Sequence, residues 1–165
     1  MWNLWQLAEK MINVLYEDNH VLCVEKPINI PVMEDDSHDM DLLTMCKEYL
    51  KEKYQKPGNV YCGLVHRLDR PVGGVMVFAK TSKAASRLSE SVRTHQLKKE
   101  YLAILDGIPT KKSDTLEDYL FKDTRTNTVS VTDAKHGKKC HLSYEVISQK
   151  EKKSLVHITL GTGRS

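Results

Sequence analysis

The sequence predicts an α+β (mixed α/β) domain, in which a central, mainly antiparallel and twisted sheet is flanked by a few helices. Two patterns indicate this class. Apolar residues alternate with polar ones at period two over much of the second half of the chain, whereas two earlier segments repeat them at helical spacing. The 165 residues also contain no Pro/Gly/Ser-rich linker, which predicts one domain over 1–165.

The first part of the chain predicts a β-hairpin followed by a helix. Strands are expected over 13–16 and 20–25, because "EDN" between them supplies polar turn residues. Two prolines then favour an extended loop in "INIPVM", since proline has no backbone donor. Apolar residues at helical spacing predict an amphipathic helix over about 39–54, with Asp39 as its N-cap.

The middle of the chain predicts two strands around a charged loop, and then a second helix. The segment "NVYCGLV" leads into the charged stretch as a strand, and "GVMVFAK" leaves it as another. Ala85, Leu88 and Val92 share one helical face, so a helix is expected over 82–96 with Ser82 as its cap.

The last part of the chain predicts antiparallel strands. "KKEYLAILDG" is typical of a strand, and a hairpin is expected in "EDYLFKDTRTNTVSVTDA" with Arg125 to Asn127 near its tip. Period-two alternation then predicts two half-buried strands, whose apolar positions are Cys140, Leu142, Tyr144 and Val146 in one and Val156, Ile158 and Leu160 in the other.

Composition sets broad limits on the class of protein. The net charge of +3 permits a nucleic-acid partner without demanding one. The four cysteines form no CxxC pair and indicate reduced thiols of an intracellular protein. No apolar run approaches the roughly 20 residues of a membrane helix, and "MWNLWQLAEKM" lacks the features of a signal peptide, so a soluble, cytoplasmic protein is expected.

The charged stretch "HRLDR" lies where the sheet pattern is interrupted. Asp69 is its only carboxylate, and Arg67 and Arg70 flank it. A loop held between two strands can present a reactive side chain rigidly. An aspartate between arginines is more often part of a structural salt bridge or a turn cap, so the stretch by itself leaves both roles open.

The stretch "HRLDRPVGGVMVFAKT" resembles the signature of the RluA-type family of RNA pseudouridine synthases. The matching residues are His66, Arg67, Leu68, Asp69, Gly73, Ala79 and Lys80. The sequence departs from the family pattern at Pro71-Val72, where the family usually has Thr-Ser, and Gly74 follows. This departure concerns the geometry of the loop and the choice of substrate rather than the reaction.

Three further segments resemble motifs of the same family, in the same order. The opening hairpin ends in Lys26-Pro27, "KKEYLAILDG" is similar to a Lys-x-Tyr-x-Ala strand that carries Lys99 and Tyr101, and "ITLGTGRS" is similar to the start of a Thr-Gly-Arg motif that ends here at Arg164. Four motifs in register are far more specific than any one of them.

The resemblance implies an enzyme that isomerises a specific uridine of ribosomal or transfer RNA to pseudouridine, without a cofactor or a metal. It implies that Asp69 is the catalytic carboxylate, acting as a nucleophile or as a base, with Arg164 as its ion-pair partner and Tyr101 beside the target base. Contact with RNA is expected from another group of residues, namely His66, Arg67, Arg70, Lys80 and Lys99.

The resemblance also implies how much of the family's domain is present. Family members usually continue for about a further third of the catalytic domain, so 1–165 is expected to be a monomeric catalytic domain that lacks its C-terminal part and has no separate N-terminal RNA-binding module. No membrane partner is expected. The alternatives are an inactive RNA-binding remnant of the family and a protein-interaction fragment.

Overall fold

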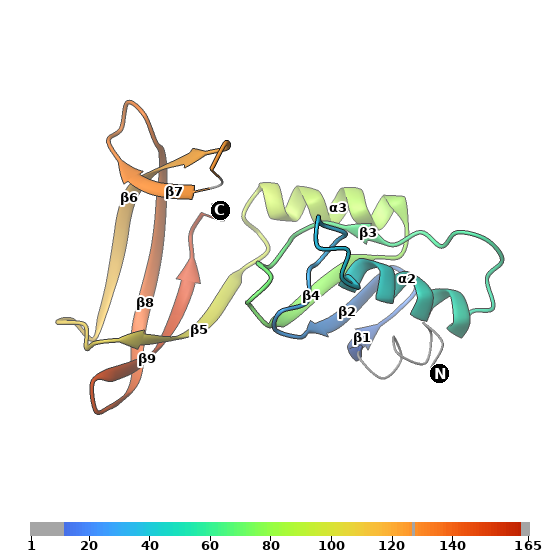
Figure 1. Ribbon diagram of the computed structural model, residues 1–165, viewed down its shortest axis with the longest axis horizontal. Helices are drawn as coiled ribbons and strands as arrows, with labels where there is room; N and C mark the ends of the chain where they lie inside the picture. Colours follow the sequence, from blue (N-terminus) through green and yellow to red (C-terminus); the bar gives the residue numbers. More distant parts are fainter. Residues whose placement is uncertain (1–11, 127, 163–165) are drawn as a thin grey trace. The chain divides into compact units, whose positions relative to one another are not determined.

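The computed structural model describes residues 12–126 and 128–162, so the opening segment "MWNLWQLAEKM" and the predicted partner Arg164 lie outside the described residues. The chain divides into two compact units, with the boundary between Thr94 and His95. The described part contains two helices and two antiparallel sheets (Figure 1), which confirms the α+β class. Each unit is described by itself.

The sheet of the first unit has the strand order β1-β2-β4-β3, with every neighbouring pair antiparallel. Its strands are β1 (Asn13–Glu17), β2 (Val21–Lys26), β3 (Gly63–Leu64) and β4 (Gly74–Ala79). The predicted hairpin is confirmed as β1 and β2. The strand predicted over "NVYCGLV" is wrong in length, because only Gly63 and Leu64 pair with β4.

The helices of this unit are α2 (Leu42–Lys53) and α3 (Ser82–Arg93), and both predicted caps are wrong. The cap of α2 is Asp41, whose Oδ1 accepts from the Thr44 backbone N–H at 2.9 Å. The cap of α3 is Thr81, whose hydroxyl oxygen accepts from the Ala84 N–H at 3.1 Å. In each case the cap stands three residues before the amide it satisfies, which is the spacing that N-capping requires.

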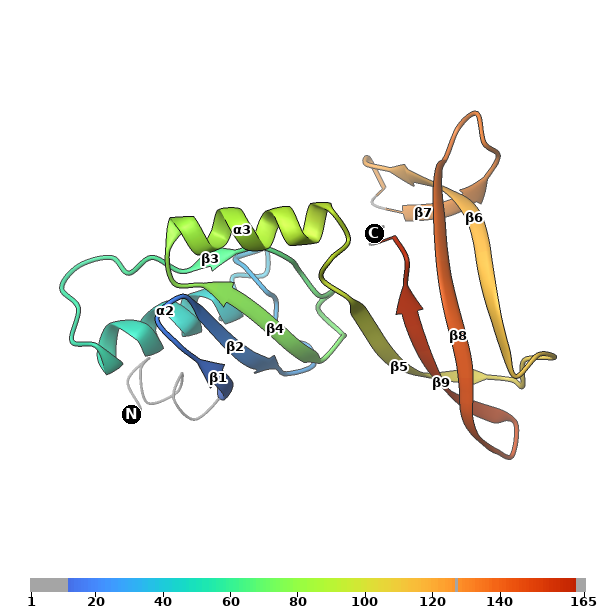
Figure 2. The ribbon, with the colours of Figure 1, turned by 180° about the vertical axis from the view of Figure 1, so that it is seen from behind.

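Helix α2 covers one face of this sheet and closes the main core (Figures 1 and 2). The fully buried contributors include Leu22 and Val24 of β2, Met76 and Phe78 of β4, and Leu42, Met45, Cys46 and Leu50 of α2. Burial of each large side chain contributes roughly 1.5–3 kcal/mol, which fixes β2 and β4 as the rigid centre of the unit. Helix α3 packs against β4 and β3.

The sheet of the second unit has the strand order β5-β9-β8-β6-β7 and is antiparallel throughout. Its strands are β5 (Lys99–Asp106), β6 (Ser113–Asp123), β7 (Thr128–Thr132), β8 (Lys138–Lys150) and β9 (Lys153–Leu160). The β6–β7 pairing confirms the predicted hairpin (Figure 2). The predicted alternation in β8 is confirmed, because its even-numbered positions from 140 to 146 are less exposed than their neighbours.

Among residues 12–126 and 128–162, no helix is long and apolar enough to cross a membrane.

Candidate active site

The loop that carries Asp69 runs from the end of β3 to the start of β4. The backbone N–H of Val72 donates to the carbonyl oxygen of Asp69 at 3.0 Å and closes a tight turn. Asp69 itself is exposed, whereas Leu68 packs against the core. The loop is therefore anchored on one side and presents its carboxylate to solvent on the other, as a reactive group on a rigid support requires.

A buried lysine anchors this loop through hydrogen bonds to its backbone. Lys26 ends β2, is 1% exposed, and donates its ammonium protons to three backbone carbonyl oxygens. The distances from Nζ are 2.9 Å to Arg70 O, 2.7 Å to Val72 O and 3.0 Å to Pro27 O. Because an ammonium has three donors and no acceptor, these bonds satisfy it completely. Two of them bracket the turn that follows Asp69.

The charge of Lys26 also links it to Asp69. Burial lowers the pKa of Lys26 from its ordinary value, and the nearby Arg70 charge lowers it further, whereas the Asp69 carboxylate raises it. Burial disfavours an ammonium, and a neighbouring carboxylate favours it. Lys26 is thus a cation within electrostatic reach of Asp69 in the first unit.

The two adjacent glycines allow the loop to join β4 closely. A Cβ on Gly73 would lie 3.1 Å from Ile28 Cγ2 and 3.3 Å from Lys26 O, so a side chain there would push the loop away from the end of β2. Gly74 has φ +144, a conformation that L-residues rarely adopt. Gly73 is therefore needed where the loop passes close to the end of β2, and Gly74 is needed where the backbone turns into β4.

His66 takes the place of a strand partner. The backbone N–H of Val77 in β4 donates to Nε2 of His66 at 3.0 Å. Strand β3 stops at Leu64, and the imidazole satisfies a backbone donor of β4 beyond that point. Nε2 must be unprotonated to accept this bond. His66 therefore ties the Asp69 loop to β4.

The two arginines beside Asp69 have different surroundings. Arg67 is exposed, and its Nη1 lies 3.8 Å from the sulfur of Met33, which is a weak acceptor. Arg70 instead forms an ion pair with Asp39. This contact holds Asp39 outside α2, which explains why Asp39 does not cap the helix.

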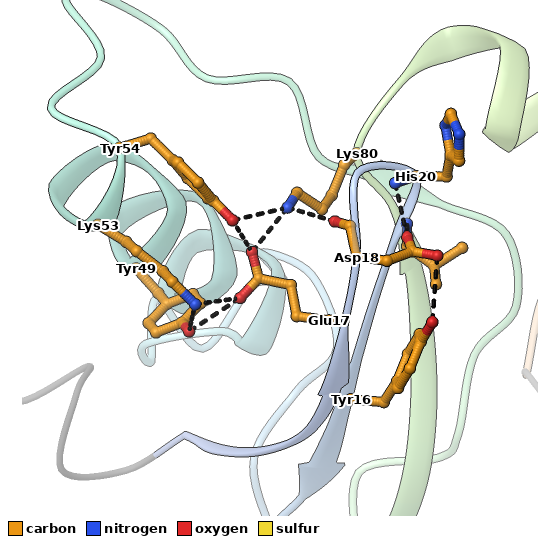
Figure 3. Close-up of polar contacts among 9 residues, drawn as sticks. Tyr16, Glu17, Asp18, His20, Tyr49, Lys53, Tyr54 and Lys80 are labelled. Atoms are coloured by element: carbon orange, nitrogen blue, oxygen red, sulfur yellow. Dashed lines mark hydrogen bonds and ion pairs between the residues drawn. The ribbon is translucent and has the colours of Figure 1, made fainter.

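Lys80 lies at the far end of β4 from the Asp69 loop, in a polar cluster of the first unit (Figure 3). Its side chain is 7% exposed, and its ammonium lies 2.6 Å from Glu17 Oε1 and 2.6 Å from the carbonyl oxygen of Asp18. Burial would lower the pKa of Lys80, but hydrogen bonds to Glu17 and Tyr54 raise it overall. The predicted contact of Lys80 with RNA stays a prediction.

Lys99 and Tyr101 belong to β5 in the second unit and lie on the same face of the sheet, because alternate residues of a strand do so. Lys99 is opposite Leu160 and Tyr101 is opposite Ile158, and both side chains are half-buried. The structure thus brings His66, Arg67, Asp69 and Arg70 together in one loop, and Lys99 and Tyr101 on one strand. An association of Asp69 with Tyr101 and Arg164 stays a prediction.

Sequence reasoning missed Lys26 and Glu17 as residues that position the loop and the sheet. Lys26 carried a usable signal: Leu22, Val24 and Lys26 alternate along β2, and all three are buried. A lysine on the apolar face of a strand needs a partner, and the carbonyl oxygens of an irregular loop can supply one. Glu17 gave no comparable signal, because in the sequence it is part of the polar run that predicts the turn between the first two strands.

Comparison with solved structures defines the class of fold. The human RNA pseudouridylate synthase domain-containing protein 4 matches 98% of this chain, and the match covers 64% of that protein's chain, with a TM-score of 0.82 and 21% identity. The human RNA pseudouridylate synthase domain-containing protein 1 matches 93% of this chain, and the match covers 60% of that protein's chain, with a TM-score of 0.73 and 20% identity. The fold is that of a pseudouridylate synthase domain.

The sequence comparisons then give the family. The model of the RNA pseudouridylate synthase family matches residues 20–165, and the chain belongs to this family, among its RluA-type members. A ribosomal large subunit pseudouridine synthase C of Buchnera aphidicola is 29% identical over 93% of this chain and 47% of its own length. An uncharacterized RNA pseudouridine synthase of Zymomonas mobilis is 30% identical over 92% of this chain and 68% of its own. The chain spans about half the length of several curated relatives.

Proposed function

We propose that the chain carries the catalytic loop of an RNA pseudouridine synthase and that Asp69 is the essential carboxylate of the reaction. The observation that carries this proposal is the Asp69 loop itself. It holds the family's His-Arg-Leu-Asp residues, exposes the carboxylate, and is fixed by Lys26 and His66. A group held in this way needs little reorganisation when a substrate arrives.

The chemistry needs a single carboxylate and no external energy source. The bond between uracil N1 and ribose C1′ breaks, the base turns, and a bond forms between C5 and C1′, while C5 loses a proton and N1 gains one. Asp69 would attack the sugar as a nucleophile or remove a sugar proton as a base, and both roles require its ionised form.

Further residues are proposed to complete the site when the whole protein binds RNA. Tyr101 would stack on the uracil, which is worth roughly 1–3 kcal/mol for an aromatic ring and a base. Arg164 would form an ion pair with Asp69, and Lys99 would contact the RNA backbone. Arg67 would fill the space left by a flipped base or bind phosphate, which is supported by its exposed guanidinium next to Asp69.

The proposed substrate is ribosomal or transfer RNA. The curated relative named a ribosomal large subunit pseudouridine synthase supports ribosomal RNA as the first substrate to test. A cytoplasmic location is proposed with it, which is supported by the four cysteines, all free of disulfides.

A tritium-release assay tests the proposal. RNA transcripts labelled with tritium at C5 of uridine are incubated with the protein, and the released tritium is counted. Release is expected with the unsubstituted chain and is expected to fall below detection with Asp69→Asn, which keeps the shape of the side chain and removes its charge. Asp106→Asn, a matched change at an exposed carboxylate at the end of β5, should leave release unchanged.

The same transcripts separate the alternatives. Binding of RNA without any release of tritium would contradict the proposed activity of this chain and support an RNA-binding remnant. Absence of both binding and release, in a protein shown to be folded by circular dichroism, would contradict any role on RNA.

A further inference from the structure

The segment between β2 and α2 carries a dense group of carboxylates. We define the acidic segment as residues 33–39, which contain Glu34, Asp35, Asp36 and Asp39, all exposed. RNA is a polyanion, so uncompensated carboxylates beside an RNA-processing loop would repel it. The position and the charge of this segment therefore matter for any substrate that approaches Asp69.

Arg70 fixes the acidic segment to the Asp69 loop through its side chain. Its Nη2 forms an ion pair with Asp39, its Nη1 donates to the hydroxyl oxygen of Ser37 at 2.9 Å, and the same nitrogen lies 3.6 Å from Asp35 Oδ2. Its Nε donates to the carbonyl oxygen of Asn29 at 3.2 Å. All three guanidinium nitrogens thus contact the segment that connects β2 to α2.

The backbone of Arg70 is part of the same attachment. Its carbonyl oxygen accepts from the Asn29 N–H at 2.8 Å and from Lys26 Nζ at 2.9 Å. Arg70 directly follows Asp69, so the residue next to the candidate catalytic carboxylate joins three parts of the unit: the Asp69 loop, the end of β2 and the acidic segment.

These contacts conflict with the role in RNA binding that the sequence predicts for Arg70. A guanidinium binds a carboxylate and a phosphate through the same planar array of N–H donors. In Arg70 this array is directed at Asp39, Ser37 and Asn29. The hydrogen bond from Arg70 lowers the pKa of Asp39 from its ordinary value, so the pair stays ionised over the physiological range.

We infer that Arg70 is a positioning residue: it holds the acidic segment against the Asp69 loop and compensates one of the segment's four negative charges, and it does not itself bind RNA phosphate. The inference rests on the proposed function for its catalytic consequence. Its structural part, the attachment of the segment, is independent of turnover and can be tested even if the chain has no activity.

Limited proteolysis of the full chain tests the attachment. An endoproteinase that cleaves before aspartate can cut the acidic segment at Asp35 and Asp36, provided that the segment detaches. Cleavage there is expected to accelerate at least about fivefold in Arg70→Ala and in Asp39→Asn, because proteolysis follows the population of the open form. The double variant should be no faster than Arg70→Ala alone, since that change already removes the contact with Asp39.

Two matched changes serve as controls. Arg93→Ala removes an exposed guanidinium of α3 that pairs with Glu90, and Asp36→Asn removes an exposed carboxylate of the acidic segment; cleavage at Asp35 is expected to stay at the original rate in both. An unchanged cleavage rate in Arg70→Ala would overturn the inference.

The salt dependence of RNA binding separates positioning from phosphate contact. Loss of one phosphate contact lowers the slope of log K against log salt by about one. The slope for the labelled transcript is expected to be the same in Arg70→Ala as in the unsubstituted chain. A slope lower by about one would overturn the inference whatever the proteolysis shows. Failure of the proposed function would appear separately, as absence of tritium release from the unsubstituted chain.

Discussion

Replacing Glu17 by glutamine should strongly destabilise the first unit. The Glu17 side chain is 7% exposed and accepts hydrogen bonds from Tyr49, Lys53, Tyr54 and Lys80 (Figure 3). These donors come from the second half of α2, from its C-cap Tyr54 and from the residue after β4, so one carboxylate at the end of β1 joins three elements. Glu17→Gln keeps the shape of the side chain and removes the charge.

The magnitude follows from the pKa of Glu17. Burial would raise this pKa, but the hydrogen bonds from Lys53, Lys80, Tyr54 and Tyr49 outweigh it and lower the pKa from 4.5 to about 2. At about 1.4 kcal/mol per pKa unit, the ionised carboxylate contributes about 3 kcal/mol to the free energy of unfolding. Removing it also leaves the buried Lys80 ammonium without its charged partner, which acts in the same direction.

The sign of the pH dependence gives a second test. A carboxyl group whose pKa is lowered by folding stabilises the fold fully above its ordinary pKa and loses this contribution as the pH falls toward its folded value. The difference in unfolding free energy between the unsubstituted chain and Glu17→Gln should therefore be constant above about pH 5 and shrink between 4.5 and about 2.

Urea unfolding by circular dichroism, repeated from neutral to acidic pH, measures this difference. Native-state hydrogen exchange at amides of β2 and β4 assigns it to the first unit. Glu90→Gln is the matched control, because Glu90 pairs with Arg93 on the exposed surface of α3 and its loss should change nothing measurable. A loss below about 1 kcal/mol in Glu17→Gln at neutral pH, or one that persists undiminished in acid, would refute the reasoning.

Three other substitutions test the loop and a helix cap. Lys26→Met removes the ammonium donor from the carbonyl oxygens of Pro27, Arg70 and Val72, of which Arg70 O keeps the Asn29 N–H, so urea unfolding should show a loss of about 2 kcal/mol or more; an unchanged midpoint would contradict the anchoring role. Gly74→Ala forces a side chain into φ +144 and should lower the free energy of unfolding by at least about 1 kcal/mol, which thermal unfolding measures. Asp41→Ala removes the cap of α2 and should cost about 1 kcal/mol by urea unfolding, whereas Asp39→Ala should leave α2 intact; equal helix losses in both would restore Asp39 as the cap.

Much of the fold could be predicted from sequence periodicity, because local patterns determine local structure. The polar turn between β1 and β2 placed these two strands within one residue of their observed ends, and the alternation from 140 to 146 lies inside β8. The caps show the limit of such patterns. Asp39 and Asp41 are equivalent as capping residues, and what separates them is the ion pair that Asp39 makes with Arg70, 31 residues away.

The candidate site shows the same limit more strongly. The resemblance to a family identified the Asp69 loop, but the contacts that hold it join Lys26 to carbonyl oxygens 44 and 46 residues further along the chain. Glu17 and Lys80 are 63 residues apart. No periodicity reports such pairs, because they depend on how β2 and β4 pair and on what the intervening loops bring alongside.

The contact between Lys26 and the Asp69 loop has a consequence for how freely the loop can change. The ammonium is held as a small metal ion is held in an ionophore, by carbonyl oxygens that every amino acid supplies. These hydrogen bonds therefore do not depend on which side chains stand at positions 70 to 72. The loop can carry Pro71 and Val72 where the family usually has Thr-Ser and still keep its anchor, so natural variation can reshape the surface around Asp69 without moving the carboxylate.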